Sequence, residues 1–161
     1  MTVAFCGSAI EIRYSVGLRD TAGNPAHAAT FIRKRLIVLD EELRLQASEH
    51  ARILAHEIFH FAWVRLGNPA RLEWEVLLRR EFARRVPGEA GWSAEWRKLR
   101  LRPRDIRLRT RAWREYCCES FCDTAAAWLT GSRTEATIPR RILRARFAQL
   151  AASLPPGGLP I

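Results

Sequence analysis

The chain has few histidines and no long apolar stretch, and both features limit its chemistry. Its only four histidines stand at positions 27, 50, 56 and 60, so a metal site that needs a histidine after His60 is excluded. No apolar run approaches the about 20 residues of a membrane-spanning helix. The N-terminus also lacks a basic segment followed by an apolar one. We therefore expect a cytoplasmic protein without a membrane span.

Cysteines are also few, and their spacing does not suit a disulfide framework. Three of the four, Cys117, Cys118 and Cys122, lie within one and a half helical turns, where adjacent side chains point apart. We expect reduced thiols that pack as small apolar side chains. Cys118 and Cys122 are four residues apart and share one helix face, so a structural or alternative metal site at these thiols stays open.

Length and composition favour one domain. A chain of 161 residues with 48% hydrophobic content can bury one sizeable core. We predict a single domain over residues 1–153. Residues 154–161 are rich in proline and glycine, and we expect them to form a flexible tail.

Positive charge is concentrated in residues 71–114. This segment contains fourteen Lys and Arg against six Asp and Glu, which is +8 of the chain's net +10. Such a field attracts nucleic acid, acidic proteins or anionic lipid. We predict a basic insertion that recruits a substrate or partner; the alternative is a solvated arginine-rich face.

The most informative stretch is His56–His60, which reads His-Glu-Ile-Phe-His. On a helix, His56 and His60 lie one turn apart and can bind one metal ion, with Glu57 beside them. Ser48 and the stop signal Gly67-Asn68-Pro69 predict a helix over residues 48–66. Its apolar side chains surround the histidines, so the sequence predicts half of a zinc site inside the core.

A catalytic zinc ion usually has three protein ligands and one water, so a third ligand is needed. Because no histidine follows His60, it must be a downstream carboxylate or cysteine. Glu119 is the best candidate, since it and Asp123 lie four residues apart on an otherwise apolar helix predicted over residues 111–129. Buried acids need partners, and a metal ion and a histidine ring would provide them.

These residues resemble the gluzincins, whose HExxH helix is followed by an ExxxD helix, and more narrowly the small ImmA/IrrE-type zinc peptidases. The resemblance covers residues 35–40, 53–60 and 119–129. It implies that His56, His60 and Glu119 ligate zinc, that Glu57 is the general base, and that Asp123 orients a ligand histidine. The metzincin pattern is excluded, because Gly and His do not follow His60 at its spacing.

The chemistry so implied is hydrolysis of a peptide bond by a zinc-activated water, without a covalent intermediate. Tyr116 is the nearest candidate donor to the oxyanion; Tyr14 and an arginine of residues 71–114 are alternatives. In the resembling peptidases an edge strand pairs with the extended substrate. The resemblance implies that Leu36, Ile37, Val38 and Leu39 bind the substrate in this way.

The expected fold is α+β and zincin-like: a small N-terminal antiparallel sheet, then a mainly helical core that carries the HExxH helix and the Glu119 helix. Strands are expected within residues 2–18 and over residues 30–39. The alternative function is a basic regulatory module that binds nucleic acid, with structural zinc or none. A peptidase that acts on a DNA-bound protein would combine the two. Only a catalytic site needs Glu57.

Overall fold

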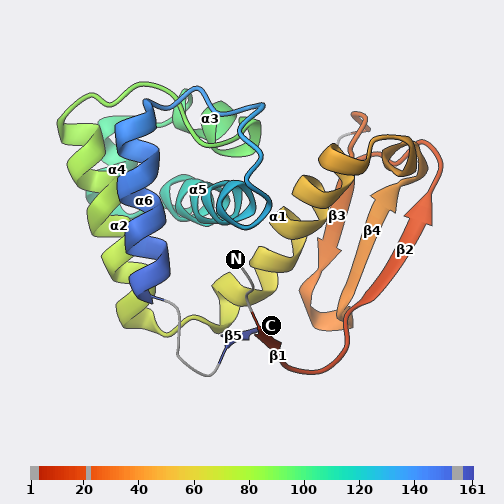
Figure 1. The fold of residues 1–161 in the computed structure, drawn as a ribbon. Helices are drawn as coiled ribbons and strands as arrows, with labels where there is room; N and C mark the ends of the chain where they lie inside the picture. The colour runs from red at the N-terminus through yellow and green to blue at the C-terminus, as the bar shows by residue number, and fades with distance from the viewer. Residues whose placement is uncertain (1–3, 21–22, 154–157) are drawn as a thin grey trace.

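The computed structural model describes residues 4–20, 23–153 and 158–161. Small sheets form the N-terminal part and helices form most of the remainder, so the fold is mixed α+β. In Figure 1 the first helix, α1 (Ala47–Arg65), lies between a three-stranded sheet and the other helices. Within the described residues, no helix has the length and apolar character needed to span a membrane.

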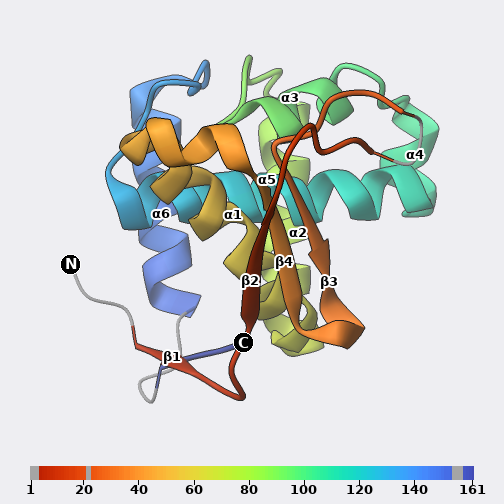
Figure 2. The same ribbon diagram turned by 90° about the vertical axis from the view of Figure 1, so that its right-hand side faces the viewer.

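The three-stranded sheet contains β2 (Glu11–Ser15), β3 (Ala28–Phe31) and β4 (Leu36–Asp40). β4 lies in the centre, parallel to β2 and antiparallel to β3, as Figure 2 shows. The prediction of an antiparallel sheet is therefore wrong: the sheet is mixed. The single strand expected over residues 30–39 is two strands. A short 3-10 turn, Ile32–Lys34, and Arg35 with φ 50° reverse the chain between them.

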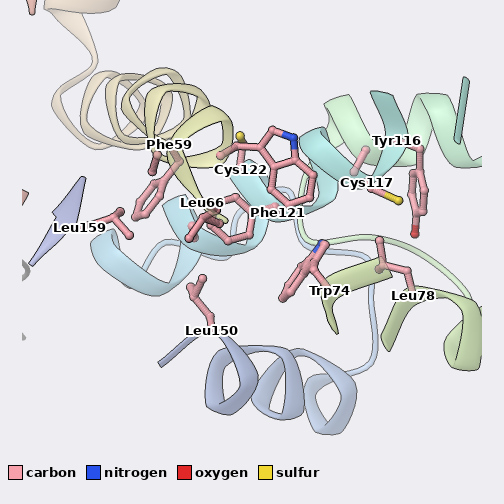
Figure 3. Packing of buried hydrophobic residues seen from close by; sticks show 14 of the residues in the cluster. Phe59, Leu66, Trp74, Leu78, Tyr116, Cys117, Phe121, Cys122, Leu150 and Leu159 are labelled. Carbon is pink, nitrogen blue, oxygen red and sulfur yellow. The ribbon is translucent and has the colours of Figure 1, made fainter. Parts of the chain in front are cut away.

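The remaining helical elements are η2 (Glu41–Leu45), α2 (Asn68–Ala83), α3 (Trp92–Lys98), α4 (Pro103–Leu108), α5 (Arg111–Thr130) and α6 (Arg140–Ser153). α5 runs across the helical part and ends at Gly131, which has the left-handed φ of 70° usual after a helix. The main core forms around it. Figure 3 shows Phe121 and Cys122 of α5 packed among Phe59, Leu66 and Trp74.

Residues 71–114 are part of this scaffold. Trp74, Leu78, Ala94 and Trp113 belong to the same buried cluster as Phe121. The prediction that the segment lies apart from the catalytic scaffold is wrong, because its apolar side chains fill the core against α5. Its predicted recruitment of a substrate or partner stays a prediction.

The charge of residues 71–114 is nevertheless presented outward. Glu75, Glu81 and Glu89, three of the six acids, are buried in ion pairs with arginine or lysine. Most of the arginines of the segment are exposed, including Arg100, Arg104 and Arg107. Binding of nucleic acid or an acidic partner by this surface stays a prediction.

The C-terminal residues contribute to the fold. β5 (Leu159–Pro160) pairs in parallel with β1 (Phe5–Cys6), and Leu159 is buried against the main core. The predicted flexible tail is therefore wrong for residues 158–161, because strand pairing and burial of Leu159 hold them. Residues 154–157 lie outside the described residues.

Candidate metal centre

The two histidines of α1 face α5 and lie close together. Nε2 of His56 and Nε2 of His60 are 3.1 Å apart. The helical repeat puts both on one face, as the sequence predicts, and packing of α1 against α5 buries His56 almost completely. The Nε2 atoms of the two imidazoles are therefore close enough to bind the same metal ion.

Asp123 of α5 contacts the other nitrogen of His56. Its Oδ1 lies 2.8 Å from His56 Nδ1, and its Oδ2 accepts a hydrogen bond of 2.9 Å from the backbone N–H of Ala94. The predicted contact between Asp123 and a histidine is therefore present. Burial disfavours the charged imidazole, but Asp123, Glu119 and Glu57 outweigh it and raise the pKa of His56 well above its usual value.

Glu119 lies one turn before Asp123 on α5 and contacts the same histidine. Its Oε2 is 3.3 Å from His56 Nε2, and its Oε1 is 3.2 Å from Nη2 of Arg97 on α3. Burial opposes ionisation of this carboxyl, yet the two histidines and Arg97 lower its pKa to about 2. Glu119 is therefore a carboxylate, and one of its oxygens contacts the imidazole of His56.

These separations fit a metal ion. Two ligands at about 2.0–2.1 Å from a tetrahedral zinc ion lie about 3.3–3.4 Å apart. The 3.1 Å between the imidazole nitrogens and the 3.3 Å to Glu119 are close to that value. His56, Glu57 and His60 also form a group with potential ligand atoms all within 4.8 Å of one another, so these residues could hold a metal ion.

A cleft of about 330 Å³ opens in front of this group. His56, Glu57, His60 and Glu119 line one part of it. Thr30 of β3 donates a hydrogen bond of 2.5 Å from its hydroxyl to Oε2 of Glu57. The Glu57 carboxylate is thus fixed beside the imidazoles and faces the cleft.

The strand beside the cleft is β3, and this corrects the predicted substrate-binding residues. β4 has β2 on one side and β3 on the other, so the backbone of Leu36–Leu39 is already paired in the ladder. Ile37 and Leu39 are also fully buried. β3 is an edge strand, and its residues Ala28, Ala29 and Thr30 line the cleft.

Tyr116 does not face the cleft, so its prediction as the oxyanion donor is wrong. Its hydroxyl donates a hydrogen bond of 2.5 Å to the buried Glu89, and its side chain is completely buried. The alternative Tyr14 contacts His50, with 2.8 Å between the hydroxyl and Nε2. An arginine of the basic segment, the third alternative, is present: Arg97 lines the cleft.

A second group of potential metal ligands consists of His60 and two cysteines of α5. Nδ1 of His60 is 3.5 Å from Sγ of Cys118 and 3.6 Å from Sγ of Cys122. Hydrogen bonds from Cys122 and His60 outweigh burial and lower the pKa of the Cys118 thiol to about 6, while burial raises that of Cys122. These three side chains also form a group that could hold a metal ion.

Sequence reasoning missed two residues of the site. Gly91 precedes α3 with an extended backbone, and a Cβ atom there would lie 2.5 Å from Cγ of Asp123. The glycine is needed for this close approach, which no local pattern reveals. Thr30 had a weak signal only, as a polar residue within an expected strand.

No protein-family model, curated protein or solved structure matches this chain. Only the geometry of the site therefore indicates what the protein does.

Proposed function

We propose that this protein is a zinc-dependent peptidase with a zincin-like site, in which His56, His60 and Glu119 hold the metal ion. The observation that carries the proposal is the pair of contacts at His56 Nε2, which lies 3.1 Å from His60 Nε2 and 3.3 Å from Glu119 Oε2. A structural zinc site would use four protein ligands and would not need Glu57 at an open cleft.

A bound zinc ion would supply Lewis acidity and lower the pKa of a water molecule towards about 7. Glu57 accepts the proton of the attacking water and delivers it to the leaving amine. The Thr30 hydroxyl, 2.5 Å from Oε2 of Glu57, holds the carboxylate in one orientation for both transfers. Asp123 holds Nδ1 of His56, which leaves Nε2 facing the other donors.

Arg97 replaces Tyr116 as the proposed donor to the oxyanion. Its guanidinium lies at the cleft and contacts Oε1 of Glu119 at 3.2 Å, which leaves further N–H groups for the substrate. Positively charged donors fixed before the reaction stabilise a developing oxyanion at little reorganisation cost. The segment of positive charge thus contributes one residue to the proposed chemistry.

The edge strand β3 suits an extended peptide as the substrate. A peptide laid along Ala28–Phe31 would add a strand to the sheet and place its backbone next to Glu57. Main-chain pairing of this kind selects the extended conformation rather than particular side chains.

Metal analysis of the Glu119→Ala variant tests the proposed ligands. We expect the wild type to hold one zinc ion per chain and the variant to lose most of it, because two imidazoles alone leave the ion with too few protein ligands. The matched control is Glu115→Ala, one turn earlier on α5 and partly exposed, which should retain zinc. Full retention of zinc by Glu119→Ala would assign the third position to another residue.

Gly91→Ala tests the role of Asp123 without changing a polar group. The added methyl carbon would approach Cγ of Asp123 to 2.5 Å and must displace the carboxylate from His56. We expect zinc affinity to fall by on the order of 10- to 100-fold, as for loss of a hydrogen-bond partner of a ligand histidine. Competition with a chelating dye measures it.

Gly67→Ala is the control for that substitution, since its Cβ would meet only Cδ of Pro69 at 3.6 Å. If Gly91→Ala bound zinc as tightly as Gly67→Ala, the contact between Asp123 and His56 would have no influence on the metal.

A further inference from the structure

The thiols of Cys118 and Cys122 both contact Nδ1 of His60, and neither cysteine lines the cleft. Both cysteines lie on the face of α5 that packs against α1, one turn apart. Their sulfur atoms are 3.5 and 3.6 Å from Nδ1 of His60, and neither is in a disulfide. The three side chains come from two helices that the core holds firmly.

At most one of the two sulfur contacts can be a well-directed hydrogen bond to Nδ1. The Nδ1 atom of an imidazole has either one lone pair or one N–H group, so it makes one well-directed hydrogen bond. Two sulfur atoms at nearly equal distances instead fit the vertices of a coordination sphere. A zinc ion with Zn–N of about 2.0–2.1 Å and Zn–S of about 2.3 Å separates nitrogen and sulfur by about 3.6 Å.

We propose that His60 Nδ1, Cys118 Sγ and Cys122 Sγ form a second metal site, selective for thiophilic cations such as Zn²⁺ or Cu⁺. Thiolate ligands favour these soft or borderline ions over Mg²⁺ and Ca²⁺. The cation binds both sulfur atoms as thiolates and Nδ1 without its proton, so any protons that these groups carry are released on binding, and no oxidant or reductant takes part.

The two sites compete for His60, and this step depends on the proposed function. A neutral imidazole offers one lone pair, at Nε2 or at Nδ1. The catalytic site needs it at Nε2, next to Nε2 of His56, whereas the thiolate site needs it at Nδ1. A cation held by the cysteines therefore removes one ligand from the catalytic site, and excess thiophilic metal inhibits the peptidase.

Titration with Cd²⁺ tests the thiolate site, because a bond between sulfur and cadmium gives a charge-transfer band in the near ultraviolet. A phosphine keeps the thiols reduced, and it contains no sulfur that could bind the metal. The double variant Cys118→Ser/Cys122→Ser should lose the band. The double variant Cys6→Ser/Cys117→Ala retains the two proposed ligands and should keep it. Circular dichroism checks that each variant is folded. If Cys118→Ser/Cys122→Ser unfolds, the single variant Cys118→Ser, at a half-buried position, replaces it.

His56→Ala separates this proposal from the proposed function. It removes the catalytic site and leaves the cysteines and His60, so the band should persist with equal or higher Cd²⁺ affinity. A band that survives in Cys118→Ser/Cys122→Ser, or that is absent from the wild type, would overturn the thiolate site. A weaker band in His56→Ala than in the wild type would overturn the competition.

Discussion

Replacing Glu57 by glutamine should abolish peptide hydrolysis and leave both zinc binding and the fold intact. The amide of glutamine has the size of the carboxylate but cannot accept the proton of the attacking water. Loss of a general acid–base group costs about 10²- to 10⁴-fold in rate. The Thr30 hydroxyl, 2.5 Å from Oε2 of Glu57, can still contact the amide, so the local geometry should survive. Turnover of a randomised mixture of internally quenched fluorescent peptides measures the effect.

Glu49→Gln is the matched control for Glu57→Gln. It makes the same change on the same helix, two turns earlier, where Glu49 pairs with Arg52 outside the cleft. We expect its turnover to equal that of the wild type. Zinc content should be the same in all three proteins. If Glu57→Gln hydrolysed the peptides as fast as Glu49→Gln, Glu57 would have no part in the mechanism.

The helical part of the site could be predicted because its signals are local. A helix places His56 and His60 one turn apart, and the same rule brings Glu119 and Asp123 onto one face of α5. An apolar surround for both pairs indicated that the two helices pack together. The structure places the two faces in contact, with Asp123 at 2.8 Å and Glu119 at 3.3 Å from His56.

The sheet could not be predicted as well, because strand order depends on contacts between distant residues. Leu36–Leu39 is an apolar run, and such a run fits a central strand as well as an edge strand. The reversal at Arg35 was hidden since arginine is not a usual residue for a positive φ. Only the observed pairing identifies β3 as the edge strand next to Glu57.

Contacts between side chains of separate segments could not be predicted from the sequence either. Tyr116 lies one turn before Glu119, and this spacing suggested a shared site. Its hydroxyl is held instead by Glu89, from the segment before α3. The charge count of residues 71–114 likewise gave no sign that Glu75 and Glu81 are buried in ion pairs with arginine. Composition does not distinguish a buried ion pair from a solvated one.

Replacing Arg146 by methionine should destabilise the protein more than any surface substitution. Arg146 is completely buried in α6 and binds Glu81 at 2.6 Å and Glu89 at 2.5 Å. Methionine fills much of the same space but leaves two buried carboxylates without the guanidinium. Removing one partner of a buried ion pair costs about 3–5 kcal/mol, a large part of the about 5–15 kcal/mol that stabilises a domain.

Arg111→Met provides the control for burial. Arg111 pairs with Glu115 at 2.6 Å, as short as the contact between Arg146 and Glu81, but its side chain is 86% exposed. An exposed pair of this kind contributes about 0.3–0.5 kcal/mol. Urea unfolding followed by tryptophan fluorescence measures both variants. Equal losses of stability in the two variants would show that burial of Arg146 does not decide its contribution.

The dependence of stability on pH should also change in Arg146→Met. Burial opposes the charge on Glu89, but Arg146 and Lys98 outweigh it and lower the pKa of Glu89 from 4.5 to about 2. Because the pKa is lower in the folded state, this carboxylate stabilises the protein fully above pH 4.5 and progressively less as the pH falls to about 2. In Arg146→Met only Lys98 of these two positive charges remains, so the pKa of Glu89 should rise and acid unfolding should move to higher pH. Fluorescence-detected acid titration of wild type, Arg146→Met and Arg111→Met compares the midpoints, and an unchanged midpoint in Arg146→Met would contradict this account of the ion pair.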